Sequence, residues 1–407
     1  MHVQSKVGVF GFKYRAVLSV IPLTLVGMIT FLHPSTWFKL IPMASSVRFL
    51  DLSLLTFNVD CFNAGQTDLN TIDCDPGKRD FNYPTAVFKL FVLLDWNSAS
   101  TVALGFFLFL IVSSVLAMIS QMYLAKSAKN LELVLWSFLF TSPPVLLLIE
   151  RGNIDSLMFG MLALCLFFAK KLFLVLVISV VGFTFKIFLI GMSIFGLLKK
   201  QFSLFFLVSS ISTVWIIFNL SDFQRVFRNS DYYEWFSFGS RVLPIQIFRY
   251  FGFNPDGKIL FVISSLIGFS VTALIVLILS IRNSRRSPIP SFFDTNTYEK
   301  RLRFGYAGGV WTCIFFMGLN FDMRLIFLIP VFMQLRSGYR RKLLPLFVFF
   351  MYSSFGPYGL QTIGDLLLTI FTSLVVFELL SLFMENFKFN PLKRFPHSST
   401  ASDLDTR

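Results

Sequence analysis

Long runs of apolar residues, separated by short polar segments, make up most of the chain. A helix of about 20 apolar residues crosses a bilayer, and a shorter one can be tilted or covered by protein. The runs predict helices at 16–32, 101–124, 131–149, 155–169, 172–198, 202–219, 259–281, 305–319, 325–335, 343–356 and 366–384. The pattern therefore predicts an all-α polytopic membrane protein with about 10–12 transmembrane helices.

The run 172–198 differs from the others. Lysine pairs flank it at 170–171 and 199–200, and Lys186 lies near its middle. It is too short for two full spans, so we expect two half-helices that enter and leave on the same side, with Lys186 at the tip. Non-helical backbone at that depth is tolerated where it lines a cavity. The alternative is a lysine that extends along an ordinary span to the interface.

Composition supports the membrane assignment. Of 407 residues, 55% are hydrophobic and 14% are charged, against about 25% charged residues in a soluble domain. The 36 Lys and Arg exceed the 22 Asp and Glu, which in a soluble protein would indicate nucleic-acid binding. In a membrane protein the excess indicates positive-inside topology and contact with anionic lipids. We therefore expect membrane lipids, and no nucleic acid, as partners.

The basic residues also predict an orientation. A cytoplasmic N-terminus and a hairpin at 172–198 place most Lys and Arg on the cytoplasmic side and most acidic residues on the outer side. Residues 1–384 then form one transmembrane domain, with outer loops at about 33–100 and 220–258. The tail 385–407 is expected to be cytoplasmic and disordered. No small-residue cleavage site follows 16–32, which predicts an uncleaved first span.

The first outer loop contains two further features. The apolar stretch from Tyr83 to Trp96, broken by charges, predicts an interfacial helix. Cys61 and Cys74 share this loop on an oxidising side, so a disulfide between them is expected. It would close a loop of about 14 residues, worth roughly 3 kcal/mol.

A candidate catalytic carboxylate, Asp60, follows a short apolar run in the first loop. A carboxylate at the membrane surface can act as a general base. The alternative is a helix-end residue in a solvated loop, and Asp51, Asp75 and Asp80 compete for the catalytic role.

Two cations near the apolar layer are candidate phosphate ligands, Lys186 as a compact ammonium and Arg324 as a bidentate guanidinium. Arg324 could instead pair with Asp322 at a tight turn. Segment 150–155 contains Arg151 and Asn153 and carries three charges. This exceeds what helix capping needs, although capping is the simpler explanation.

Other chemistries lack their motifs. The chain has no Gly-x-Gly-x-x-Gly, Walker loop, His-Glu-x-x-His or Gly-x-Ser-x-Gly. Its three His residues are far apart, so a His-based metal site is not expected. No metal and no cofactor is assigned, although Asp60 and Asp80 could in principle hold a divalent ion.

Several short motifs occur in an order that resembles a known family. They are Asp60-Cys61-Phe62-Asn63-Ala64-Gly65, Phe81-Asn82-Tyr83-Pro84, Arg151-Gly152-Asn153, Phe185-Lys186 and Asn320 to Leu325. The chain resembles the GT-C glycosyltransferases, most nearly glycosyltransferase family 87, the polyprenyl-phosphate-mannose-dependent mannosyltransferases and their bacterial relatives. It departs from the family pattern at Asn153, where Gln is frequent, and at Thr85, where a second Pro is frequent.

The resemblance implies a GT-C-like bundle with a large first extracytoplasmic loop, juxtamembrane helices and a cleft at the membrane surface. It implies transfer of a sugar, such as mannose, from a polyprenyl-phosphate carrier to a lipid- or glycan-linked acceptor, with inversion. Asp60 would be the general base, and Lys186 and Arg324 would bind the donor phosphate. Substrate-binding roles would fall to Tyr83, Arg151, Asn153, Asn320 and Asp322. The implied location is a bacterial cytoplasmic membrane, with both termini in the cytoplasm.

Two alternatives remain from the residues alone. A transporter or flippase of a lipid-linked glycan would show broken helices in paired halves, and only one broken segment is evident. A polysaccharide polymerase or ligase would use an Arg-rich outer loop, which 220–258 provides. The enzyme hypothesis requires that Asp60, Lys186 and Arg324 converge on one site.

Overall fold

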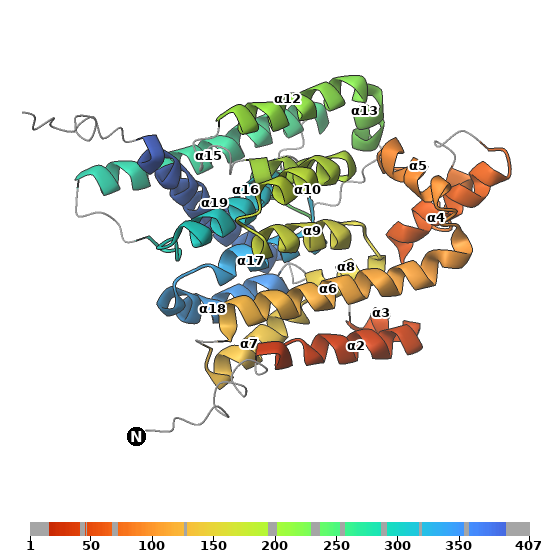
Figure 1. Cartoon of the computed structure of the whole chain (residues 1–407), viewed down its shortest axis with the longest axis horizontal. Coiled ribbons are helices and arrows are strands. Elements are labelled where there is room, and N and C mark those ends of the chain that lie inside the picture. The colour runs from red at the N-terminus through yellow and green to blue at the C-terminus, as the bar shows by residue number, and fades with distance from the viewer. Residues whose placement is uncertain are drawn as a thin grey trace, which may run out of the picture.

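The computed structural model is a helical bundle (Figure 1). It describes residues 16–40, 45, 47–66, 72–125, 128–193, 202–228, 237–252, 257–285, 291–316, 320–353 and 358–387. In Figure 1 the longer helices run side by side across the molecule, while α4 and α5 lie at one end of the bundle. This end contains the predicted first outer loop.

The first part of the chain forms that loop and the helices before and after it. They are α2 (Ile21–Leu32), the 3-10 helix η1 (Pro34–Thr36), α3 (Trp37–Leu40), α4 (Leu50–Asn63), η2 (Ile72–Cys74), α5 (Thr85–Leu93), η3 (Ser98–Ser100), α6 (Thr101–Leu124), α7 (Asn130–Phe140), α8 (Pro143–Arg151) and α9 (Asp155–Phe167). The expected interfacial helix in 83–96 corresponds to α5.

The second part contains the remaining helices and one short pair of strands. They are α10 (Leu172–Phe185), η4 (Ile187–Ser193), α12 (Phe202–Phe218), α13 (Leu220–Arg228), β1 (Ser237–Phe238), α14 (Val242–Tyr250), α15 (Gly257–Arg285), α16 (Tyr298–Phe316), β2 (Asn320–Phe321), η6 (Asp322–Phe327), α17 (Leu328–Met333), α18 (Ser337–Ser353) and α19 (Tyr358–Phe387). Strands β1 and β2 pair antiparallel and join the second outer loop to η6.

Several helices are those of a membrane protein. Among the described residues, three helices are long and apolar enough to cross a bilayer, at Ser98–Leu124, Val262–Asn283 and Gly359–Glu385. Two bent pairs, α7 with α8 and α12 with α13, raise the number to five if each pair is one span. Four shorter apolar helices accompany them, at Ala16–Leu32, Asp155–Phe167, Leu172–Phe185 and Met323–Met333. Each predicted apolar run thus contains a helix, and the described residues include three to five candidate membrane-spanning helices.

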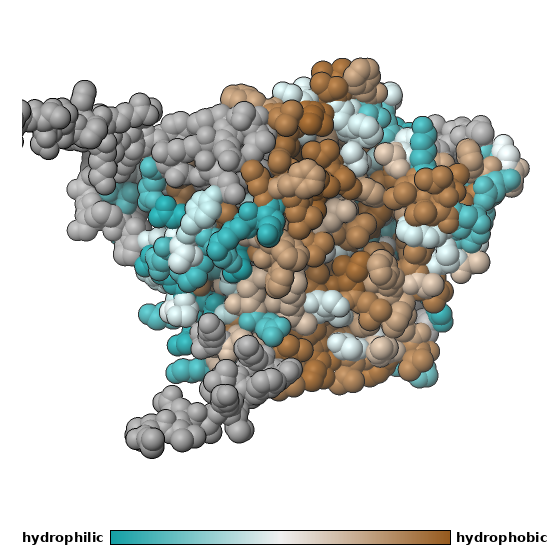
Figure 2. All heavy atoms as spheres, viewed as in Figure 1, coloured by the Kyte–Doolittle hydropathy of each residue, from teal (hydrophilic) through white to brown (hydrophobic). Residues whose placement is uncertain are grey.

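The surface carries the pattern that a bilayer requires. Figure 2 shows an apolar band across the middle of one face, with hydrophilic residues gathered toward its two ends. Large apolar side chains remain exposed along the helices, including Phe173 at 80% and Phe218 at 82%. Exposure of this extent exceeds what a water-soluble surface carries, which supports the membrane assignment.

The segment 172–193 contains the predicted break at Lys186. Helix α10 ends there, because the backbone of Lys186 is extended (φ −147°, ψ 118°). The 3-10 helix η4 then packs back against α10, so closely that a Cβ on Gly182 would lie 2.2 Å from Leu189 Cδ1. Lys186 therefore lies at the break between α10 and η4, where the sequence predicted an interruption. Residues 194–200, with the second lysine pair, lie outside the described residues.

A glycine contact fixes η4 against α16. A Cβ on Gly191 would lie 2.3 Å from the carbonyl oxygen of Gly309, so the two backbones touch directly. Because Lys186 lies five residues before Gly191 in the chain, the position of η4 also determines where the lysine lies.

We expect Gly191→Ala to destabilise the protein by about 1–3 kcal/mol, as overpacking does in a close-packed interior. Thermal unfolding in detergent micelles measures this as a fall in Tm of several degrees. Gly338 on α18 is the matched control, since a Cβ at this position would meet no atom within 4 Å. Equal Tm values for Gly191→Ala and Gly338→Ala would contradict the contact.

Candidate functional site

Asp155 is the centre of a charged cluster at one end of the bundle. It is the first residue of α9, and its side chain is fully buried. Arg324 on η6 donates from Nε to Asp155 Oδ2 at 2.8 Å. Lys186 places its Nζ 3.7 Å from Asp155 Oδ1. A buried carboxylate is tolerated when cations pair with it, and here two distant segments supply them.

Both cations also lie against aromatic rings. The Lys186 ammonium lies 4.9 Å from the centre of the Tyr83 ring, and the Arg324 guanidinium lies 5.7 Å from that of Phe188. Their side chains remain 15% and 18% exposed, so neither is completely enclosed by protein. Within the described part of the chain, Lys186 Nζ makes no hydrogen bond, because 3.7 Å exceeds that distance.

Tyr83 is buried between opposite charges. Burial, together with the negative charges of Asp51 and Asp155, raises the pKa of its hydroxyl well above the usual range. The phenol therefore remains protonated, and its ring offers a neutral face to Lys186.

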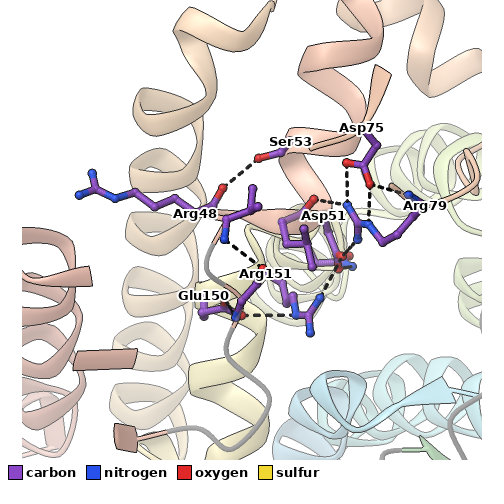
Figure 3. A network of polar contacts seen from close by, with 11 residues as sticks. Arg48, Asp51, Ser53, Asp75, Arg79, Glu150 and Arg151 are labelled. Carbon is purple, nitrogen blue, oxygen red and sulfur yellow. Dashed lines mark hydrogen bonds and ion pairs between the residues drawn. The ribbon is translucent and has the colours of Figure 1, made fainter. Parts of the chain in front are cut away.

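A second carboxylate, Asp51, lies in a network of polar contacts shown in Figure 3. Arg79 Nη1 donates to Asp51 Oδ1 at 2.9 Å, and Asn153 Nδ2 donates to Asp51 Oδ2 at 2.6 Å. Arg151 Nη1 lies 4.0 Å from Asp51 Oδ1. The Asp51 side chain stays 14% exposed. It is therefore held in one orientation and remains accessible.

Arg79 joins this network to the first-loop disulfide. Its guanidinium bridges Asp75 and Asp51 and also donates to the carbonyl oxygen of Leu50 (Figure 3). Burial opposes the charge, but the two carboxylates outweigh it and raise the pKa of Arg79. Asp75 directly follows Cys74, and the structure forms the expected disulfide between Cys61 and Cys74.

Arg151 and Glu150, two of the three charges of segment 150–155, form an ion pair. Arg151 Nε lies 3.4 Å from Glu150 Oε2, and Ser45 donates its backbone N–H to Glu150 Oε1 at 2.9 Å. Figure 3 shows Arg151 between Glu150 and Asp51, whereas the Arg48 side chain points away from the network. The capping explanation is also partly correct, because Asn153 Oδ1 accepts from the backbone N–H of Asp155 at 2.8 Å.

The turn between α8 and α9 thereby connects the two carboxylate groups. Asn153 binds Asp51 through its amide nitrogen and the Asp155 backbone through its amide oxygen. Gly152 ends α8 in the left-handed conformation (φ +59°), and a Cβ there would lie 2.9 Å from Phe49 Cβ. Only glycine is accommodated without strain or displacement at this position.

Phe49 anchors the start of α4, which carries Asp51. Its backbone is left-handed (φ 50°), an unusual conformation for a bulky residue. The ring packs on Gly105 of α6, where a Cβ would come within 2.6 Å, and lies 5.4 Å from the Phe31 ring. Surrounding packing of this kind is what maintains such a backbone. Phe49 thus determines where Asp51 points.

Asp60 does not join the cluster, so the expected convergence of Asp60, Lys186 and Arg324 is wrong for Asp60. It lies about two and a half helical turns beyond Asp51, roughly 13–14 Å along α4 and on the opposite face. It is half-buried and accepts from the Ser98 backbone N–H at 3.2 Å. One of its sequence competitors, Asp51, instead contacts Arg79 and Asn153.

Of the other predicted residues, the structure brings Tyr83, Arg151 and Asn153 to the cluster. The side chains of Asn320 and Asp322 lie outside the described residues. Sequence reasoning did not assign Asp155 and Arg79 to the site. Asp155 did have a signal, as the third charge of a six-residue segment.

The cluster contains cations that can bind an anion. In the ranges that the structure describes, no group of three or more His, Cys, Asp or Glu could hold a metal ion. The four cations Arg79, Arg151, Lys186 and Arg324 are instead each partly exposed. Oriented cations at the edge of a low-dielectric region bind phosphate or a developing negative charge.

No protein-family model, no curated protein and no solved structure matches the chain.

We expect Asp155→Asn to destabilise the protein by about 3–5 kcal/mol, because it leaves two poorly solvated cations without their counter-charge. Thermal unfolding in detergent measures the change. Glu385→Gln is the control, since Glu385 is 53% exposed and pairs with Arg301 at the surface. Such surface pairs contribute about 1 kcal/mol or less, so equal losses in Tm would contradict the central role of Asp155.

Proposed function

We propose that the protein is a GT-C-type glycosyltransferase, resembling glycosyltransferase family 87. It transfers a sugar from a polyprenyl-phosphate carrier to a lipid- or glycan-linked acceptor at the outer face of the membrane. One observation carries this proposal: Lys186 and Arg324, distant in the chain, both pair with the buried Asp155 and both remain partly exposed. They lie at one end of an apolar bundle, where a lipid phosphate can approach them.

The two cations bind the donor phosphate. Asp155 orients Arg324 through a hydrogen bond, and it lies 3.7 Å from the Lys186 ammonium, beyond hydrogen-bond distance. When the bond between the sugar and the carrier's phosphate breaks, that phosphate gains negative charge. Cations that are already in place stabilise this charge without having to reorganise. The Phe188 and Tyr83 rings limit the movement of both side chains.

Asp51 is the general base in this proposal. Arg79 and Asn153 occupy one position on each carboxylate oxygen, which leaves further lone pairs for an acceptor hydroxyl. The acceptor oxygen attacks the anomeric carbon, and its proton passes to Asp51. The bond from that carbon to the phosphate oxygen breaks, and its electron pair leaves with the lipid phosphate, which inverts the configuration of the sugar.

The proposed topology follows from the same assignment. A bundle of about 10–12 spans in a bacterial cytoplasmic membrane would place both termini in the cytoplasm. The disulfide between Cys61 and Cys74 supports an outer location of the first loop, because disulfides persist in oxidising compartments. The short apolar helices would complete the bundle where neighbouring helices cover their ends.

Lipid transport is the second candidate function, and the bent helices favour it. Helices α7 and α8 meet at 41°, and α12 and α13 meet at 77°. Together with the break at Lys186 they give more interrupted segments than the sequence indicated, and interrupted helices line the substrate sites of transporters. A transporter would move an intact lipid-linked sugar across the bilayer, whereas the transferase would separate the sugar from its phosphate.

Reconstitution in liposomes tests the transferase. The purified protein receives a polyprenyl phosphate with a radiolabelled sugar, and the release of label from the carrier is followed in the presence of extracted membrane glycolipids. We expect Asp51→Asn to reduce the rate by about 100-fold or more, the typical contribution of a general base. Lys186→Met should reduce it by a similar factor through loss of phosphate stabilisation.

Asp60→Asn is the matched control, because it makes the same substitution on the opposite face of the same helix. It should leave the rate within about threefold of the parent, as a substitution away from the reacting atoms does. If Asp60→Asn lost activity and Asp51→Asn remained active, Asp60 and not Asp51 would be the general base. Transbilayer movement of the intact labelled lipid, with no release of sugar, would favour the transporter.

A further inference from the structure

Helix α13 of the second outer loop binds the start of α5 in the first outer loop. Asp222 accepts the backbone N–H of Thr85 at 2.8 Å through Oδ2 and the Thr85 hydroxyl at 2.6 Å through Oδ1. The residue before Thr85 is Pro84, which provides no capping side chain. Asp222 therefore caps α5 from another part of the chain, satisfying an N–H that helix starts leave unpaired.

Arg225, one turn further along α13, holds the segment that enters α5. Its guanidinium donates to the carbonyl oxygens of Phe81 at 2.9 Å and of Tyr83 at 3.0 Å. It also pairs with Asp222 and lies 5.2 Å from the centre of the Phe81 ring. Two side chains of α13 thus bind the backbone on both sides of Tyr83.

The residue held in this way is the one that lies against Lys186. The ammonium lies 4.9 Å from the Tyr83 ring centre and 3.7 Å from Asp155, without a hydrogen bond to either. Neither contact is directional, so each limits the position of the ammonium without fixing its orientation. Displacement of the Tyr83 ring would therefore change the direction of the Lys186 ammonium.

We propose that Asp222 and Arg225 are positioning residues: by fixing the backbone around Tyr83 they hold its ring against Lys186 and aim the ammonium at the phosphate of a lipid ligand. This inference rests on the proposed function, since it takes Lys186 as a phosphate ligand. It adds helix α13 of the second outer loop, which the sequence analysis described only as rich in Arg, to the groups that shape the site.

The geometry of α13 explains how it reaches the first loop. The chain turns by 77° between α12 and α13, next to Asn219, whose side chain donates to the Trp215 carbonyl oxygen at 2.9 Å. Figure 1 shows α13 descending from the end of α12 toward α5. Asp222 and Arg225 are 15% and 17% exposed, so water competes little with their hydrogen bonds.

Hydrogen–deuterium exchange tests the clamp without any enzymatic assay. In Asp222→Ala the amides of 85–90 should exchange about tenfold faster, the effect of losing a helix cap. The amides of α6 should not change. Asp222→Asn retains one acceptor oxygen, so its exchange should lie between that of the parent and that of Asp222→Ala. Unchanged exchange in Asp222→Ala would overturn the proposal.

Binding of a lipid phosphate tests the positioning role. Farnesyl phosphate is titrated into the full-length protein in detergent, and its Kd is measured by microscale thermophoresis. We expect a Kd about tenfold higher for Asp222→Ala, a smaller rise for Asp222→Asn, and a rise of at least tenfold for Lys186→Met. Asp294→Ala is the control, because it removes a half-exposed ion pair with Lys300 outside the site and should leave Kd unchanged.

The outcomes separate the two proposals. Faster exchange with an unchanged Kd in Asp222→Ala, while Lys186→Met loses affinity, would show that the clamp only stabilises α5, which overturns the positioning role and leaves the proposed function intact. An unchanged Kd in Lys186→Met would overturn the proposed function, and the positioning role with it.

Discussion

The structure of the site depends on one buried charge. Asp155 has no access to water, and its carboxylate is tolerable only because Arg324 and Lys186 pair with it from η6 and from the turn after α10. These segments belong to different parts of the bundle, so the pairing forms only when α9, η4 and η6 have packed correctly. The requirement to neutralise this carboxylate therefore links helix packing to the presence of two oriented cations at the bundle end.

A short turn extends this constraint to the first outer loop. Asn153 connects Asp155 to Asp51, and the absence of a side chain at Gly152 lets the start of α4 approach the turn. Phe49 occupies the space that glycines on two helices leave open. Small and large residues thus complement one another where the loop meets the bundle, and the carboxylate of Asp51 acquires a fixed position although it lies on a loop helix.

Much of the helical architecture was predictable, because long runs of apolar residues indicate helices of a membrane protein. The break at Lys186 was also predictable, because a charged side chain in the middle of an apolar run is costly to bury and therefore indicates an interruption of the helix. The position of Asp60 was not. Asp51 and Asp60 lie on the same helix, and choosing between them requires the helix's rotation, which Phe49 and Gly152 determine through tertiary contacts. The contact between Asp222 and Thr85 could not be predicted either, because neither segment contains a local pattern that indicates a partner so distant in the chain.

The disulfide between Cys61 and Cys74 has a consequence for biosynthesis. It closes the loop that carries Asp75, and Asp75 holds Arg79 on Asp51. On the proposed topology, this loop leaves the ribosome with free thiols and becomes cross-linked only after translocation. A newly inserted chain would therefore pass through an immature stage, in which the helices have already entered the bilayer but the carboxylate network is still unassembled. Maturation would then depend on the cell's thiol-oxidising enzymes as well as on its insertion machinery.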